Sequence, residues 1–143
     1  MKPLLFLFLT IISLQSGNDL EAAKKAAKEQ NKLILLNFSG SDWCGPCIVL
    51  RRDYIQSEVF QAMAKGNLVM VNADFPRKKK NQLPPEQVKK NEALAEKYNK
   101  EGFFPYTLLL DANGKVLKTW KGKPEVSAEK WTQEIKAICT ASK

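Results

Sequence analysis

The 143-residue sequence contains no histidine and only three cysteines. Without an imidazole, Ser/His and Cys/His nucleophilic pairs are excluded. Three cysteines cannot form a four-cysteine zinc site and no histidine can complete one, so we expect no bound metal. A haem-attachment motif is excluded as well, because Ile48 stands where that motif requires histidine after its second cysteine.

Turn-forming residues and repeats are also scarce. Glycine and proline number seven each, and no internal repeat is visible, which excludes general disorder and solenoid folds. The hydrophobic fraction of 44% and the charged fraction of 27% are typical of a soluble globular domain. The net charge is +8, but most of the excess is lysine scattered over predicted helices, with one short run at residues 77–80. We interpret these residues as a solvated surface and expect no nucleic-acid partner.

Long apolar runs are few, and the one at the N-terminus is short. Residues 4–12 are apolar except for one threonine, follow a lysine and precede small polar residues. A membrane-spanning helix needs about 20 apolar residues, whereas the apolar region of a signal peptide needs about 7–15. We therefore predict a signal peptide over residues 1–16, with an uncleaved membrane anchor as the alternative, and one domain over residues 17–143.

The pattern of apolar residues predicts the order helix, strand, helix, strand, helix, strand, strand, helix. The expected strands are residues 32–39, 68–74, 106–110 and 116–120. The expected helices begin near residues 18, 45, 86 and 127, and the third of them ends at residue 100. Ser57 is expected to cap a new segment within the second helix. An Asn-Gly turn at residues 113–114 favours a hairpin between the last two strands. This order predicts an α/β fold with a mixed four-stranded sheet, helices on both faces and an extra N-terminal helix.

The strongest chemical signal is the segment Trp43-Cys44-Gly45-Pro46-Cys47, which follows a predicted strand and begins a helix. Cysteines three residues apart in a first helical turn lie on one side, close enough for a disulfide. Free backbone N–H groups and the positive end of the helix dipole favour a thiolate there. We predict that Cys44, expected to be the more exposed, is the attacking nucleophile and that Cys47 resolves the mixed disulfide. A static disulfide or half of a metal site is the alternative.

This segment is identical to the active-site motif of thioredoxins, and the chain resembles the thioredoxin family, in particular its extracytoplasmic members. A second motif, Gly-Phe-Phe-Pro-Tyr-Thr at residues 102–107, precedes a predicted strand. The resemblance implies the thioredoxin fold, a cis peptide bond before Pro105, and main-chain pairing of Phe104 with the substrate. An ordinary trans proline is the alternative. The expected substrate-binding residues are Trp43, Gly45, Pro46, Phe104 and Pro105.

The sequence departs from the family at two charged positions. The family buries an aspartate that helps to deprotonate the second cysteine, and Asn37 stands at that place. Met70 matches the lysine that accompanies this aspartate. Losing both charges together avoids a lone buried charge, which is costly. The proton of Cys47 would then pass to water, to Asp42 or to Asp74.

Two further predictions concern apolar residues. Cys139 follows the helical spacing of Trp131 and Ile135, so we expect a buried core residue rather than a redox role. Trp43 and residues 103–106 are expected to form an apolar, partly exposed collar around the sulfurs, with core packing as the alternative for Trp43.

These observations predict a thiol–disulfide oxidoreductase that reduces protein disulfides in the periplasm or another extracytoplasmic space. The dithiol itself carries two electrons, so no cofactor is required. The expected partners are disulfide-bearing proteins and an upstream thiol donor, for which a membrane-embedded protein is one candidate. We expect the protein to be a monomer. The alternatives are a disulfide isomerase or oxidase, and a redox-inert binding module.

Overall fold

The computed structural model describes residues 20–143. The helices are α1 (Leu20–Gln30), α2 (Gly45–Val49), α3 (Glu58–Asn67), α4 (Pro85–Tyr98) and α5 (Ala128–Ala141). The strands are β1 (Leu33–Ser39), β2 (Leu68–Asp74), β3 (Tyr106–Leu110) and β4 (Val116–Lys121). A π-helix, η1 (Leu50–Ile55), continues α2, and a 3-10 turn, η2 (Lys79–Asn81), lies in the lysine-rich loop. The predicted order of elements is confirmed.

The predicted signal peptide, its anchor alternative and the start of the first helix at residue 18 lie outside the described residues. Within residues 20–143, no helix is both long enough and apolar enough to cross a bilayer.

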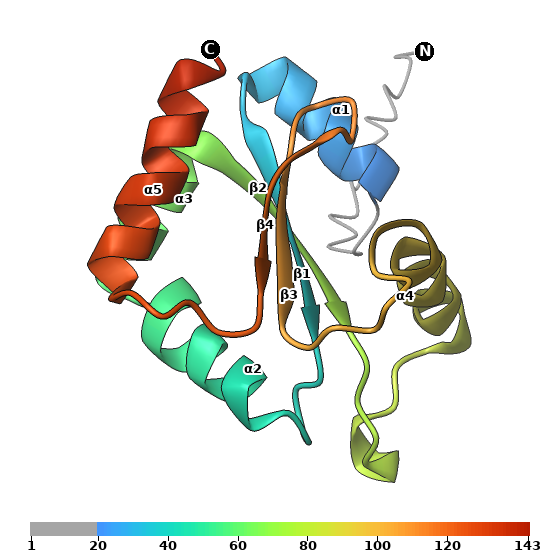
Figure 1. The fold of residues 1–143 in the computed structure, drawn as a ribbon. Helices are drawn as coiled ribbons and strands as arrows, with labels where there is room; N and C mark the ends of the chain where they lie inside the picture. Colours follow the sequence, from blue (N-terminus) through green and yellow to red (C-terminus); the bar gives the residue numbers. More distant parts are fainter. Residues whose placement is uncertain (1–19) are drawn as a thin grey trace, which may run out of the picture.

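The four strands form one mixed sheet in the order β2-β1-β3-β4 (Figure 1). Strand β1 runs parallel to β2 and antiparallel to β3, and β3 pairs antiparallel with β4. Because β1 is central and covered on both faces, all seven of its residues are buried, which explains its nearly continuous apolar sequence. The pairing also places Asn37 between Asn72 on one side and Thr107 on the other.

Helices cover both faces of the sheet, as predicted (Figure 1). One core lies under α3, α5 and η1 and is built around Trp131, whose ring stacks on Phe60 with 5.4 Å between centroids. Cys139 belongs to this core and is 1% exposed, which confirms the prediction that it is a buried residue. The second core lies under α1 and α4 and includes Phe38, Leu94 and Leu108.

Polar side chains set several element boundaries. The hydroxyl of Ser57 accepts the N–H of Phe60 at the start of α3, as its predicted capping role requires. In the predicted hairpin, the Asp111 carboxylate accepts the N–H groups of Asn113 and Lys115. Helix α4 ends at Tyr98, two residues before the predicted boundary, since Asn99 leaves the helical conformation.

Candidate functional site

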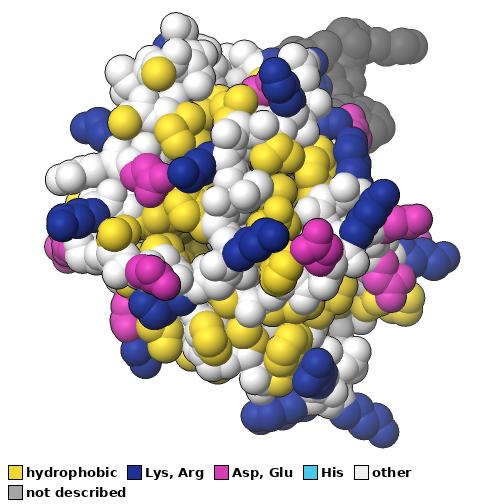
Figure 2. Space-filling view, viewed as in Figure 1, with side chains coloured by type: hydrophobic (Ala, Val, Ile, Leu, Met, Phe, Trp, Pro, Cys, Tyr) yellow, Lys and Arg dark blue, Asp and Glu magenta, His cyan; other side chains and the backbone are white. Residues whose placement is uncertain are grey.

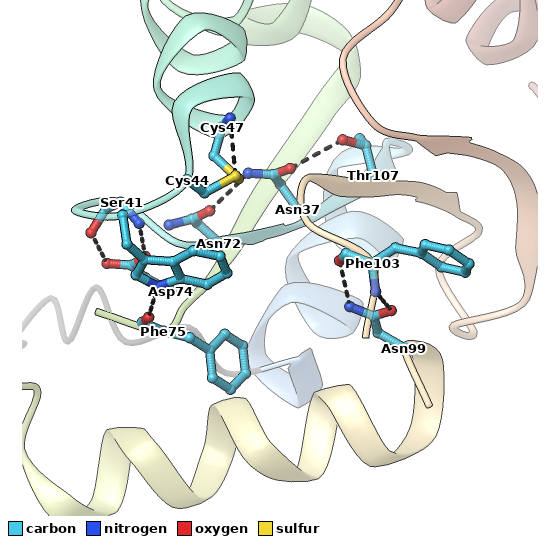
Figure 3. The surroundings of a disulfide bond; sticks show 11 residues. Asn37, Ser41, Cys44, Cys47, Asn72, Asp74, Phe75, Asn99, Phe103 and Thr107 are labelled. Carbon is cyan, nitrogen blue, oxygen red and sulfur yellow. Dashed lines mark hydrogen bonds between the residues drawn. A yellow bond between two sulfur atoms is a disulfide. The ribbon is translucent and has the colours of Figure 1, made fainter. Parts of the chain in front are cut away.

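Cys44 and Cys47 form a disulfide at the N-terminal end of α2, with their Cα atoms 5.2 Å apart (Figure 3). Cys44 is the N-cap residue, and its Sγ accepts the backbone N–H of Cys47 at 3.3 Å. Pro46 lies in the first helical turn, where its missing N–H leaves no bond unmade. The prediction that the two sulfurs lie within bonding distance is confirmed.

Exposure hardly separates the two cysteines. Cys44 is 5% exposed and Cys47 is 3% exposed. Cys44 is the more exposed of the two, as expected, but the difference is very small in the disulfide form. Gly45 and Pro46, between them, are exposed. What distinguishes Cys44 is its capping position, because a backbone N–H points at its sulfur. Such a donor stabilises negative charge on Sγ once the disulfide is reduced.

A neutral polar network lies beside the disulfide. The Asn37 amide is 7% exposed, donates from Nδ2 to Asn72 Oδ1 at 3.1 Å, and accepts the Thr107 hydroxyl at 3.0 Å. In Figure 3 this amide points toward the disulfide. In the pairing of β1 with β2, Met70 lies opposite Leu35 and Asn72 lies opposite Asn37. The Met70 side chain is 42% exposed. The sequence analysis missed Asn72 and Thr107. Each is a polar residue within a largely apolar strand, β2 or β3, and each lies opposite Asn37.

The two carboxylates considered as proton acceptors have different surroundings. Asp42 accepts the N–H groups of Arg77 and Lys78, both at 2.9 Å, and the Asn81 amide at 3.0 Å. These hydrogen bonds, that from Arg77 foremost, hold the pKa of the Asp42 carboxyl below its usual range. Asp42 therefore anchors the loop after β2. Asp74 accepts both the N–H and the hydroxyl of Ser41.

Asp74 shares a cleft with Asn37. This cleft has a volume of about 480 Å³ and is also lined by Asn72, Ser39 and Met70. Asp42 is not among the lining residues. Of the two carboxylates, Asp74 is therefore the one that lines the same cleft as the Asn37 amide. Water in this cleft has access to the Asp74 carboxylate.

Trp43 and Phe104 form an aromatic groove next to the disulfide. The Trp43 indole N–H donates to the Phe75 carbonyl at 2.7 Å, and the two rings of Trp43 and Phe104 meet edge to face at 5.4 Å. Phe75 packs against Phe104 at 5.6 Å, and the Arg77 guanidinium lies 3.8 Å above the Trp43 ring. With Pro76 and Gly102, these residues line a groove of about 660 Å³.

The predicted apolar collar is thus confirmed in part. Phe103 and Tyr106 contact each other at 5.8 Å between centroids and line a different cavity with Lys121, so their inclusion in the collar was wrong. Phe103 and Phe104 are adjacent in the chain but line different cavities. Sequence analysis missed Phe75 and Arg77, because nothing local indicates that their loop returns to Trp43.

The loop that carries Phe104 and Pro105 is fixed by specific hydrogen bonds. The Phe104–Pro105 peptide bond is cis, the isomer that the family resemblance implied. The Pro105 carbonyl accepts the Gly122 N–H at 2.8 Å. Before it, the Asn99 side chain exchanges two hydrogen bonds with the Phe103 backbone (Figure 3). Among residues 20–143, no group of three or more His, Cys, Asp or Glu side chains is placed to hold a metal ion.

Comparison with known proteins agrees with this geometry. A family model described as thioredoxin-like matches residues 14–112. The chain belongs to the thioredoxin-like family. Disulfide bond reductase DsbH of Chlamydia pneumoniae is 42% identical over 95 residues, which are 66% of this chain and 55% of that protein. Thioredoxin-related protein DsbJ of the same organism is 35% identical over 57 residues, 40% of this chain and 16% of that protein. The match therefore spans about half of DsbH and less of DsbJ.

Solved structures give the same result for the fold. A structure of a DsbH oxidoreductase matches with a TM-score of 0.74 and 36% identity, over 82% of this chain and 79% of that chain. The reduced C-terminal domain of DsbD from Neisseria meningitidis matches with a TM-score of 0.55 and 24% identity, over 82% of this chain and 92% of that chain, and bears on the fold alone. The predicted thioredoxin fold is confirmed. The cysteine pair and the likeness to DsbH support a thiol–disulfide oxidoreductase.

Proposed function

We propose that this protein is a thiol–disulfide oxidoreductase that reduces protein disulfides outside the cytoplasm. The observation that carries the proposal is the Cys44–Cys47 disulfide at the start of α2, beside an open groove. The identity of 42% to a disulfide bond reductase favours the reducing direction. So does the Gly-Pro pair between the cysteines, which resembles that of the reducing family members.

The reaction has two exchange steps. In the reduced protein, the Cys44 thiolate attacks one sulfur of a substrate disulfide, whose S–S bond breaks as a mixed disulfide forms. The first substrate thiolate leaves and takes a proton from solvent. The Cys47 thiolate then attacks the Cys44 sulfur and releases the second substrate thiolate, which is also protonated. Two electrons have passed to the substrate, and the protein is left with its own disulfide.

The residues around the sulfurs support these steps. The Cys47 N–H, directed at Cys44 Sγ, stabilises charge on the attacking sulfur. Trp43 and Phe104 supply the apolar floor for the substrate, the Phe104 main chain offers a pairing edge, and Gly45 and Pro46 lie exposed between the cysteines. The proton of Cys47 passes to water in the cleft beside Asn37, with Asp74 along the same cleft as its acceptor.

The remaining parts of the proposal concern location and partners. A signal peptide at residues 1–16 exports a domain of residues 17–143, an assignment supported by the short apolar run after a lysine. The substrates are disulfide-bearing proteins. An upstream dithiol donor, embedded in the membrane, restores the reduced state, and the likeness to DsbH and DsbJ supports a place in such a pathway. The protein acts as a monomer, without nucleic acid.

Insulin reduction with dithiothreitol as the electron donor tests the activity. We expect the wild type and Cys139→Ala to accelerate the reaction, and Cys44→Ser to be inactive because it lacks the nucleophile. Equal turnover by wild type and Cys44→Ser would remove the catalytic role. The potential against glutathione tests the direction: a reductase should lie near thioredoxin at about −270 mV, and a strong oxidase near about −120 mV.

A further inference from the structure

The groove beside the disulfide carries positive charge at its rim. Arg77 lies 3.8 Å above the Trp43 ring, and Lys78, Lys79 and Lys80 follow it as exposed residues. Within residues 20–143, none of these four side chains forms an ion pair with a carboxylate. Figure 2 shows Lys and Arg side chains gathered at the lower end of the molecule, where Figure 1 places this loop, next to hydrophobic side chains.

The loop that bears these charges is held in a defined position. The carboxylate of Asp42, two residues before Cys44, accepts the backbone N–H groups of Arg77 and Lys78. The backbone of Phe75 holds the loop at two points: its carbonyl accepts the Trp43 indole N–H, and its N–H donates to the Ser39 carbonyl at 2.9 Å. The Asp42 carboxylate thus accepts its hydrogen bonds from the loop backbone and forms no ion pair with these basic side chains. The loop therefore holds Arg77 at the groove, and the three lysines follow it on the same anchored segment.

The groove has an apolar floor and no negative wall. Its floor is made by the rings of Trp43, Phe75 and Phe104, and none of the described residues that line it carries a carboxylate. Such a site favours a segment that combines an apolar side chain with nearby negative charge.

We propose that the Arg77–Lys80 run selects substrate segments with acidic residues flanking the reacting cysteine and an apolar side chain for the groove. The inference rests on the proposed function, since it describes how the substrate of that reaction is bound. The exchange steps and their electron balance stay as given above. It also assigns a role to a run of charges that composition alone had indicated to be solvated surface.

Single-turnover reduction of matched peptides tests this selection. Three peptides, each joined through its cysteine to a fluorescence quencher by a disulfide, share one leucine and differ only in flanking Glu, Gln or Lys. The protein is first reduced with dithiothreitol and freed of it. At low salt we expect the Glu peptide to react about tenfold faster than the Lys peptide, because complementary charge speeds encounter. In about 1 M salt, where the screening length is about 3 Å, the difference should fall below about twofold.

Charge-matched variants locate the effect. Replacing Lys78, Lys79 and Lys80 together by Gln should lower the Glu-to-Lys rate ratio by about threefold or more. Arg77→Gln, tested alone, should lower it as well. The control removes the same net charge elsewhere, through Lys→Gln at the exposed positions 25, 28 and 136, and should keep the wild-type ratio.

The outcomes separate this inference from the proposed function. Equal rates for the three peptides, or an equal loss of preference in the control variant, would overturn the selection and leave the reductase intact. If the reduced protein reduced none of the peptides and no insulin, the proposed function itself would fail.

Discussion

The side chain of Asn99 pairs with the backbone of Phe103 as one β-strand pairs with another. Its Nδ2 donates to the Phe103 carbonyl and its Oδ1 accepts the Phe103 N–H, both at 2.9 Å. Asn99 is 5% exposed, directly follows α4, and precedes the loop that carries Phe104 and Pro105. A buried amide thus links the end of a helix to one wall of the groove.

Replacing this amide should weaken the fold and the groove together. Asn99→Ala removes both hydrogen bonds and leaves the Phe103 N–H and carbonyl without their partners, so the free energy of unfolding should fall by about 1–3 kcal/mol. Urea denaturation measures this loss. The matched control is Asn113→Ala, at an exposed turn position, which should stay within about 0.5 kcal/mol of wild type. Equal stability of both variants would show that the paired amide contributes nothing.

The neutral network at Asn37 predicts how the protein responds to an introduced acid. Burial should raise the pKa of the new carboxyl in Asn37→Asp above its ordinary value of about 3.9. The folded state then holds the proton more tightly than the unfolded state. Relative to wild type, the variant should therefore be most stable below about pH 4 and lose stability as the pH rises through the raised pKa.

The same substitution should change the second exchange step. A carboxylate beside Cys47 accepts its proton, so release of a small thiol from a preformed Cys44 mixed disulfide should accelerate by about tenfold or more and gain a new pH dependence. Stopped-flow measurement of thiol release gives the pH profile of this rate. The assay runs from about pH 5 to about pH 9, about two units on either side of neutrality. Thr107→Val is the control, because it removes a bond to Asn37 without adding an acid. A profile identical to wild type would contradict the role assigned to this position.

The parts of the site that the sequence could predict are those that depend on neighbours along the chain. The Cys44 and Cys47 spacing, the preceding buried strand and Pro46 in the first turn together determine where the disulfide lies. The Ser57 cap and the hairpin follow in the same way from local chemistry. Each of these predictions required only a few consecutive residues.

The parts that could not be predicted depend on strand order and loop return. Thr107 reaches Asn37 because β3 inserts beside β1, which the local pattern does not specify. The groove combines Trp43, Phe104 and the loop at residues 75–77, three segments that meet through tertiary folding alone. The same cause explains why Phe103 was wrongly grouped with Phe104.

Cys139 should be the least reactive thiol of the reduced protein. It is 1% exposed, and burial raises the pKa of its thiol, so less of it is thiolate at a given pH. Iodoacetamide at pH 8, about half a unit below the pKa of a free thiol, should modify Cys44 first and leave Cys139 unmodified, as read by peptide mass spectrometry. In urea the protection should disappear. Native labelling of Cys139 as fast as of Cys44 would contradict its core position.

Gly40 should tolerate no side chain, because the Trp43 ring lies against its backbone. A Cβ built on Gly40 would overlap Cε2 and Cζ2 of that ring. Gly40→Ala should therefore displace the indole, break its bond to the Phe75 carbonyl, and lower the free energy of unfolding by about 1–3 kcal/mol. Gly66→Ala in α3 is the matched control, since its Cβ would meet nothing within 4 Å and alanine favours a helix by about 0.5–1 kcal/mol.

The two alanine variants should thus move stability in opposite directions. Urea denaturation measures the two free energies, and the Trp43 indole N–H resonance reports whether the ring has moved. Since the ring forms the floor under Arg77, Gly40→Ala should also slow insulin reduction, while Gly66→Ala should not. An unshifted indole resonance in Gly40→Ala would mean that the ring does not rest on Gly40, and the position of the groove relative to the disulfide would then need another cause.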